Sequence, residues 1–208
     1  MPLSKVNARR ALLTQLWDDN PIFRQVLGIC SALAVTNLMF NTLLMCIGLI
    51  WTATMTNLTV SALRRFIPER VRMMIQVLII ACYVIVVDVS MNATYPDIHR
   101  VIGPYVGLII TNCIIMGRAE AFASRNRVWP SVCDGLGAGL GYSAVLMLVA
   151  VVRETLGFGT LFGFHVFPGL QSWVIMIMPP GAFFVLAVIV WLARWYALKH
   201  PPEEETAK

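Results

Sequence analysis

Residues 25–63 read QVLGICSALAVTNLMFNTLLMCIGLIWTATMTNLTVSAL, a tract of 39 residues without a single Asp, Glu, Lys or Arg. A bilayer core is crossed by roughly 20 helical residues, so this tract is long enough for two crossings. Over the whole chain 58% of the residues are hydrophobic, 13% are charged and the mean hydropathy is +0.74. A soluble domain carries about twice that charged fraction. The sequence therefore predicts a multi-pass membrane protein.

We expect an all-α integral membrane protein with six transmembrane helices. The polar breaks place these helices at residues 22–40, 43–63, 72–92, 103–118, 135–156 and 174–195. With a cytoplasmic N-terminus, fourteen of the sixteen Lys and Arg residues fall on the inner side, and only Arg100 and Arg153 fall outside. Because short loops rich in Lys and Arg stay in the cytoplasm, both termini are predicted to be cytoplasmic.

Polar segments flank the membrane domain, which we predict to cover residues 21–198. Residues 1–20 combine basic side chains with leucines and a tryptophan, which is typical of a cytoplasmic helix lying on the membrane surface. A loose tail is the alternative, and no cleavable signal peptide is recognisable. Residues 199–208 form a polar cytoplasmic tail. The net charge of +5 reflects topology, so the expected partners include the lipid bilayer and no nucleic acid.

Two cysteines occupy matching places in two apolar runs. Cys30 follows Pro21 by nine residues, and Cys113 follows Pro104 by nine. Since proline is favoured in the first turn of a helix, we expect the first helix to begin at Pro21 and the fourth at Gly103–Pro104. Nine residues at 1.5 Å each would carry both cysteines about 14 Å into the membrane, from opposite faces.

This symmetry indicates two inverted three-helix halves, about 21–95 and 103–198, whose interrupted helices meet at the midplane. A thiol in a membrane helix usually serves as a small packing residue. The alternative is a soft metal, and an iron–sulfur cluster would need four such ligands, two of them from a partner. The remaining cysteines lack a symmetric mate at this depth, and we expect them to serve in packing: Cys46, Cys82 and Cys133.

The glycines of DGLGAGLGYS (134–143) are predicted to serve in helix packing. The run lacks the spacing of a nucleotide-binding loop and opens a membrane helix. Gly135 and Gly139 are four residues apart, as are Gly137 and Gly141. This spacing lets a second helix approach closely.

The segments LGICSALAVTN (27–37) and GLIITNCIIMGRAEAF (107–122) resemble the two cysteine motifs of the NqrD/RnfE family of membrane subunits. The resemblance covers nearly the whole chain, with further matches at NPIFRQVLG (20–28), IPERVRMMIQVLIIA (67–81), VIVVD (84–88), DGLGAGLGY (134–142) and RETLGFGTLFG (153–163). Family members belong to Na⁺-translocating NADH:quinone oxidoreductases or to Rnf complexes. The Ser31–Ala32 pair and VIVVD resemble the quinone oxidoreductase branch, whereas MPPGAF (178–183) is similar to the Rnf branch.

The resemblance implies a role in electron transfer coupled to sodium export, in the inner membrane of a bacterial cell. Cys30 and Cys113 would share a [2Fe–2S] cluster with two cysteines of a homologous, inverted E subunit. NADH, flavins and the quinone (ubiquinone) would be bound elsewhere in the complex, so the isolated chain would not be catalytic. Thr111 and Asn112 flank Cys113 and are candidate hydrogen-bond donors to the cluster sulfurs.

Three charged residues are further candidates. Asp88 lies far inside an uncharged run, so it is either part of the sodium path or solvated at the outer surface. Arg118 and Glu120 stand at the cytoplasmic end of the fourth helix. They are two residues apart and do not share a helix face, so we expect them to anchor the cluster segment or to contact a neighbouring subunit.

Other functions fit parts of this pattern. The nearest rival is the E subunit of an Rnf-type ferredoxin:NAD⁺ oxidoreductase. A metal-free secondary transporter built from inverted repeats, or a scaffold subunit of a larger complex, would tolerate replacement of both cysteines.

Overall fold

A computed structural model of the chain describes residues 27–36, 38–64, 66–94, 96–158, 160–161, 164–165 and 178–199. The first half contributes α2 (Ile29–Val35), α3 (Met39–Leu63), the 3₁₀ turn η1 (Glu69–Val71) and α4 (Arg72–Thr94). The second half contributes α5 (Pro96–Ile110), α6 (Cys113–Arg118), the π-helical turn η2 (Ala119–Ala123), α7 (Val128–Phe158) and α9 (Pro179–Lys199). Two-residue strands, β1 (Thr160–Leu161) and β2 (Phe164–His165), pair antiparallel.

The helical membrane class is confirmed. Within the described residues, four stretches are long and apolar enough to cross a membrane: 39–63, 72–94, 105–123 and 128–158. A shorter apolar stretch covers residues 180–196. The six crossings and the cytoplasmic termini stay predictions, because residues 1–26, 166–177 and 200–208, with the predicted surface helix, the tail and Pro21, lie outside the described residues.

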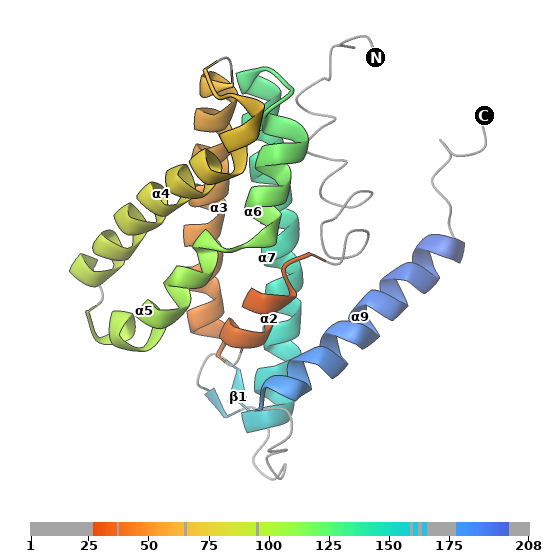
Figure 1. The fold of residues 1–208 in the computed structure, drawn as a ribbon. Helices are drawn as coiled ribbons and strands as arrows, with labels where there is room; N and C mark the ends of the chain where they lie inside the picture. The colour runs from red at the N-terminus through yellow and green to blue at the C-terminus, as the bar shows by residue number, and fades with distance from the viewer. Residues whose placement is uncertain are drawn as a thin grey trace.

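The centre of the fold is the pair α3 and α7, which run side by side in opposite directions (Figure 1). Their close approach depends on the predicted glycines. A Cβ atom added at Gly135 would lie 3.1 Å from the Ala53 carbonyl oxygen, and one added at Gly139 would lie 3.3 Å from the Ile50 Cα. The prediction that these two glycines serve in helix packing is confirmed.

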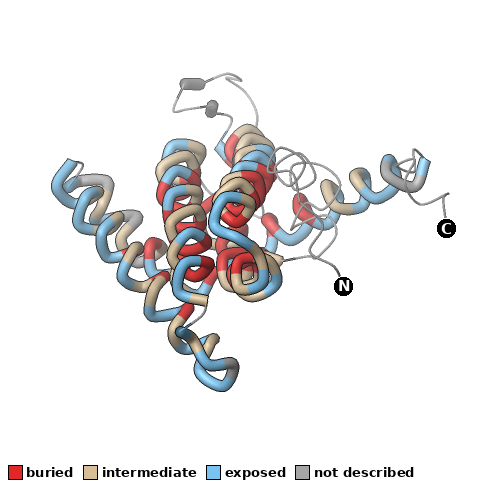
Figure 2. Tube along the Cα trace, turned by 90° about the horizontal axis from the view of Figure 1, so that it is seen from above, coloured by how far each residue is buried: buried red, intermediate tan, exposed pale blue. Residues whose placement is uncertain are grey.

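The two outer helices, α4 and α9, leave this centre in different directions (Figure 1). In the view from above, buried residues gather on the central helices while the outer helices are mostly exposed (Figure 2). In Figure 1 the chain ascends along α3 and descends along α4, whereas it descends along α7 and ascends along α9. The division into two inverted three-helix halves stays a prediction.

The predicted start of the fourth helix is wrong. The helix begins at Pro96 and runs through Gly103 and Pro104 to Ile110. The polar stretch 92–100 is thus helical apart from residue 95, which is outside the described part. The chain instead breaks at Thr111 and Asn112, and a new helix starts at Cys113. The depth of Cys113 in the membrane therefore cannot be obtained by counting 1.5 Å per residue along one continuous helix from Pro104.

A buried polar contact ties the first half to α7. The Glu154 carboxylate accepts a hydrogen bond from the Met39 backbone N–H at 2.8 Å, which satisfies a donor of the first turn of α3. The neighbouring Arg153 donates to the Thr36 hydroxyl at 2.7 Å and to the Met178 carbonyl at 3.2 Å. The break between α2 and α3 and the start of α9 are therefore held at one end of α7.

Candidate metal-binding site at the junction of two half-helices

Both predicted ligands lie in the first turn of a short helix. Cys30 is the second residue of α2 and Cys113 is the first residue of α6. The two half-helices start about midway along the α3–α7 pair and then run in opposite directions (Figure 1). The structure therefore brings the starts of the two cysteine segments together, and each cysteine lies in the first turn of a helix that begins directly after non-helical residues.

Gly28 makes this junction compact. Its backbone has φ +85°, a left-handed conformation that glycine adopts without steric cost. A Cβ atom at Gly28 would lie 2.6 Å from Ile114 Cδ1 and 2.7 Å from Tyr142 Cε2. The turn that precedes Cys30 thus packs directly against the residue that follows Cys113 and against α7.

Hydrogen bonds join the same three elements. The Tyr142 hydroxyl donates to the Gly28 carbonyl at 2.7 Å, and it also hydrogen-bonds the Ser31 hydroxyl. The Asn112 side-chain amide donates to Ser31 Oγ at 3.3 Å. Residues adjacent to the two cysteines are therefore linked directly, Ser31 from α2 and Asn112 from the start of α6.

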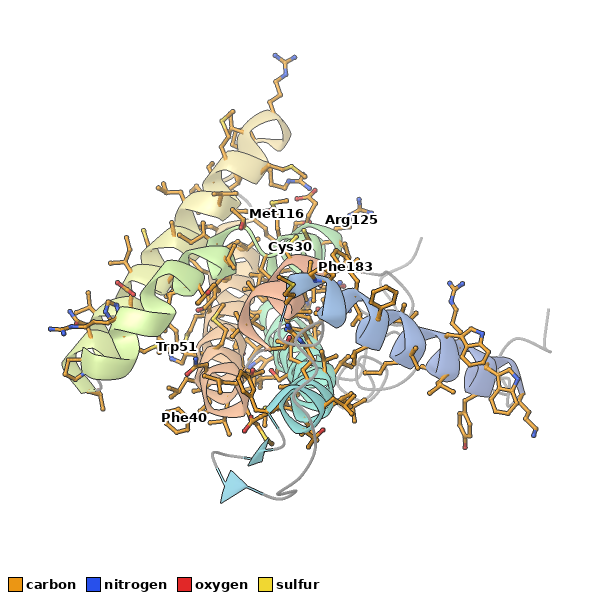
Figure 3. All side chains as sticks on the ribbon, turned by 90° about the horizontal axis from the view of Figure 1, so that it is seen from below. Cys30, Phe40, Trp51, Met116, Arg125 and Phe183 are labelled. Carbon is orange, nitrogen blue, oxygen red and sulfur yellow. The ribbon has the colours of Figure 1, made fainter. Side chains whose placement is uncertain are left out.

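The two thiols are accessible from outside the chain. All five cysteines are free, with Cys30 exposed and Cys113 half-buried. Viewed from below, Cys30 lies on α2 near the first turns of α9, which carry Phe183 (Figure 3). Among the residues that the structure describes, no group of three or more His, Cys, Asp or Glu could hold a metal ion.

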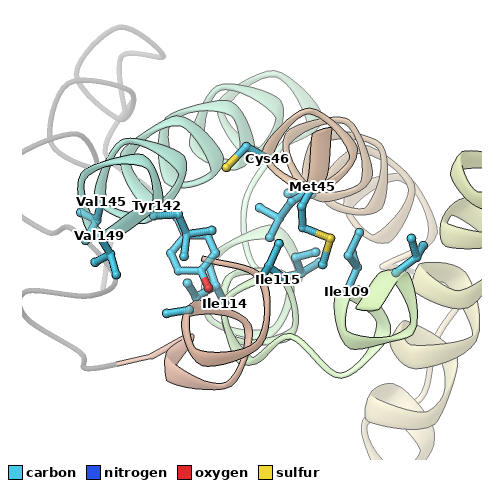
Figure 4. Close-up of a cluster of buried hydrophobic side chains, with 14 of the residues drawn as sticks. Met45, Cys46, Ile109, Ile114, Ile115, Tyr142, Val145 and Val149 are labelled. Carbon is cyan, nitrogen blue, oxygen red and sulfur yellow. The ribbon is translucent and has the colours of Figure 1, made fainter. Parts of the chain in front are cut away.

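The other cysteines have different surroundings. Cys46 is buried in the core between α3 and α7, and its thiol makes a weak 3.9 Å contact with the Ser143 carbonyl oxygen (Figure 4). Cys82 is exposed on α4 and Cys133 is half-buried on α7. The structure thus shows a packing role for Cys46.

Thr111 and Asn112, the two candidate hydrogen-bond donors to the cluster sulfurs, differ in what they contact. Asn112 is the N-cap of α6, and its side-chain oxygen accepts from the Ile114 N–H at 3.0 Å. The side-chain nitrogen of Asn112 donates to Ser31, so both the oxygen and the nitrogen of its amide already have hydrogen-bond partners. Thr111 is exposed in the break, where its carbonyl oxygen lies 4.0 Å from Cys113 Sγ. Hydrogen bonds from either residue to a cluster stay a prediction.

Arg118 points into the chain. It is 6% exposed and forms two bonds to the Asp134 carboxylate of α7, at 2.6 and 3.2 Å. Asp134 is fully buried. Of the two roles expected for Arg118, anchoring of the segment is therefore the one its geometry supports, and it has little surface to offer a neighbouring subunit.

Glu120 lies in the π-helical turn η2, a type of turn that often occurs at functional sites. Its carboxylate accepts hydrogen bonds from Arg72 at 2.9 Å and from Gln76 at 2.8 Å, both on α4. It is about one-third exposed. The contact with α4 anchors η2, and an additional contact with another subunit stays a prediction.

Asp88 has a partner that the sequence did not indicate. Its carboxylate lies 2.8 Å from His99 Nε2, across the turn between α4 and α5. The Asp88 side chain is 42% exposed and that of His99 22%. Both the ion-path and the solvated-surface interpretations of Asp88 are compatible with this position.

Comparison with known proteins identifies the family. The model of the Rnf-Nqr subunit family of membrane proteins matches residues 8–190. The chain belongs to this family.

Relatives of this Rnf-Nqr protein share much of its sequence. It is similar to the D subunit of the Na⁺-translocating NADH-quinone reductase from Aeromonas hydrophila, with 45% identity over 91% of this chain and 93% of the relative. The corresponding proteins of Aeromonas salmonicida and Psychromonas ingrahamii are 44% and 43% identical and are covered to 93% and 95% of their lengths.

Sequence reasoning missed several polar partners in this Rnf-Nqr protein. Tyr142 was considered only as part of a glycine run, yet it is fully buried and contacts both cysteine segments. A tyrosine in the middle of an apolar helix could have been noticed, because a buried hydroxyl needs a partner. Asp134 stands at the start of the same run, and an acidic residue in a membrane helix usually has a charged partner, which here is Arg118.

Proposed function

We propose that this Rnf-Nqr protein is the D subunit of a Na⁺-translocating NADH:quinone oxidoreductase. Three relatives that carry this name are 43–45% identical to it over more than nine-tenths of the chain, and this observation carries the proposal. In the proposed role the chain spans the bacterial inner membrane six times with both termini in the cytoplasm. It contributes to electron transfer and sodium export as one subunit among several.

We further propose that Cys30 and Cys113 bind a [2Fe–2S] cluster together with two cysteines of a homologous E subunit. The donor set fits one half of such a cluster. Two free thiols lie in the first turns of two neighbouring short helices, one exposed and one half-buried, and iron–sulfur clusters bind four thiolates. When bound, the cluster would supply one-electron transfer.

This chain's own residues would fix the two ligands. Small glycines let α3 and α7 pack closely at the centre of the fold. Hydrogen bonds at Gly28, Ser31 and Asn112 connect the residues next to the two thiols. Phe183 and other apolar side chains of α9 are exposed in the isolated chain, and lipid or a partner that covers them would exclude water from this side of the protein.

Metal analysis of the purified complex tests this proposal. We expect Cys30→Ser and Cys113→Ser each to lose one two-iron centre, its acid-labile sulfide and NADH-driven quinone reduction, because serine oxygen is a poor replacement for thiolate. Cys82→Ser, which changes an exposed thiol on α4, should keep all three. Unchanged iron and activity in both ligand variants would favour a metal-free transporter or scaffold. Reduction of NAD⁺ by ferredoxin, without quinone reduction, would instead assign the chain to an Rnf complex.

Asp88 is proposed to contribute to the sodium path. Replacement by asparagine removes a negative charge that attracts cations within a membrane-spanning helix. We expect Asp88→Asn to raise the sodium concentration needed for half-maximal turnover about tenfold, which corresponds to about 1.4 kcal/mol. Steady-state turnover at varied sodium concentration measures it, with Ser90→Ala on the same helix as the control. An unchanged sodium dependence would place Asp88 outside the path.

A further inference from the structure

Tyr142 occupies an unusual position for a polar side chain. It lies in the middle of α7, is fully buried and directs its ring at Ile114 (Figure 4). Its hydroxyl reaches the turn that precedes Cys30. Through this one side chain, α7 contacts both cysteine segments, at Gly28 and at Ile114.

The hydrogen bonds around Tyr142 have one consistent direction. The Gly28 carbonyl lies 2.7 Å from the Tyr142 hydroxyl and 3.3 Å from the Ser31 hydroxyl, so the tyrosine is the better donor to it. With its only proton used there, the Tyr142 oxygen accepts the Ser31 proton, and Ser31 accepts from the Asn112 amide. The chain of bonds therefore runs from Asn112 through Ser31 and Tyr142 to Gly28.

The burial of these groups makes the chain of bonds energetically important. Ser31 is 2% exposed and Asn112 is 4% exposed. Inside a membrane protein a polar group without a partner is costly, and a satisfied network holds one arrangement. Releasing one member would leave its neighbours with fewer or longer hydrogen bonds and would weaken the link between the two half-helices.

We propose that Tyr142 is a positioning residue for the two cysteine ligands. This inference rests on the proposed function, because it concerns the cluster that Cys30 and Cys113 would hold. The hydrogen bonds of Tyr142 go to Gly28 and Ser31, and neither is to a ligand's sulfur atom. It acts through Gly28, two residues before Cys30, and through Ser31 and Asn112, which adjoin Cys30 and Cys113. The potential of an iron–sulfur centre depends on ligand geometry and on surrounding hydrogen bonds.

The decisive variant is Tyr142→Phe in the purified complex, because it removes the hydroxyl and keeps the ring packed on Gly28 and Ile114. We expect wild-type iron and sulfide content, a shifted midpoint potential and altered EPR g values. We also expect iron loss to a chelator to become several-fold faster. Tyr83→Phe is the matched control, since it removes another tyrosine hydroxyl, which bonds Thr59 at 2.6 Å on the α3–α4 side; it should behave as wild type.

Ser31→Ala and the double variant give a second test. If both hydroxyls act in one chain of bonds, Ser31→Ala should shift the potential in the same direction and the double variant should add little. Wild-type potential, spectrum and chelator sensitivity in Tyr142→Phe would overturn this inference while the proposed function stands. If the wild-type complex contained no two-iron centre, both this inference and the proposed cluster site would be wrong.

Discussion

Replacing Arg118 by methionine is expected to destabilise the protein by about 3–5 kcal/mol, the usual cost of removing one partner from a buried ion pair. The change leaves the buried Asp134 carboxylate without the guanidinium that bonds it at 2.6 and 3.2 Å. Asp134 is fully buried, so water cannot replace the lost bonds. We expect a lower yield of the complex and a lower melting temperature of this protein within it.

Two further variants separate the ion pair from a general loss of charge. Arg125→Met removes an exposed arginine from the turn after η2, labelled in Figure 3, and should leave the melting temperature unchanged. Arg118→Met combined with Asp134→Leu should recover most of the lost stability, because an apolar pair replaces a charged pair at little cost. Equal melting of Arg118→Met and wild type would show that the pair contributes no net stability.

The second large effect is expected for Gly28→Ala. A non-glycine residue at φ +85° costs about 1–2 kcal/mol, and overpacking of a filled site costs about 1–3 kcal/mol more. The new methyl group would lie 2.6 Å from Ile114 and 2.7 Å from the Tyr142 ring. Because both neighbours position the cysteine segments, we expect the two-iron centre to be lost or strongly depleted, as measured by iron content and EPR.

The chain offers a matched control for this substitution. Gly107 lies in α5, where an added Cβ atom meets nothing within 4 Å, so Gly107→Ala should assemble normally. Adding Ile114→Val to Gly28→Ala removes the Cδ1 atom of the closest contact and should restore part of the iron content. A Gly28→Ala complex with full iron content and wild-type melting would refute the tight junction.

The membrane class and the glycine packing could be predicted from the sequence because each depends on neighbours along one helix. An uncharged tract long enough for a bilayer can hardly fold otherwise, since backbone groups must be satisfied internally in lipid. Glycines four residues apart lie on one face whatever the partner helix is. For the same reason Gly135 and Gly139 were correctly predicted to face a second helix.

The break in the fourth helix could not be predicted in this way. The preference of proline for the first turn predicts a start at Pro104, yet the helix runs from Pro96 to Ile110. The break occurs instead at Asn112, because its side chain caps the next helix and bonds Ser31, 81 residues earlier in the sequence. A helix end stabilised by a distant partner leaves little trace in the local pattern.

The amino-acid sequence alone was enough to predict a helical membrane protein, to recognise the family motifs and to select Cys30 and Cys113 as candidate ligands. Three features became visible only in the folded chain: both thiols lie in the first turn of a short helix, Tyr142 bonds residues next to Cys30, and Arg118 bonds Asp134. The two groups of features differ in the range of the interactions that produce them. Hydropathy and helical spacing are summed along a segment, whereas hydrogen bonds and ion pairs depend on how each helix is rotated against its neighbours.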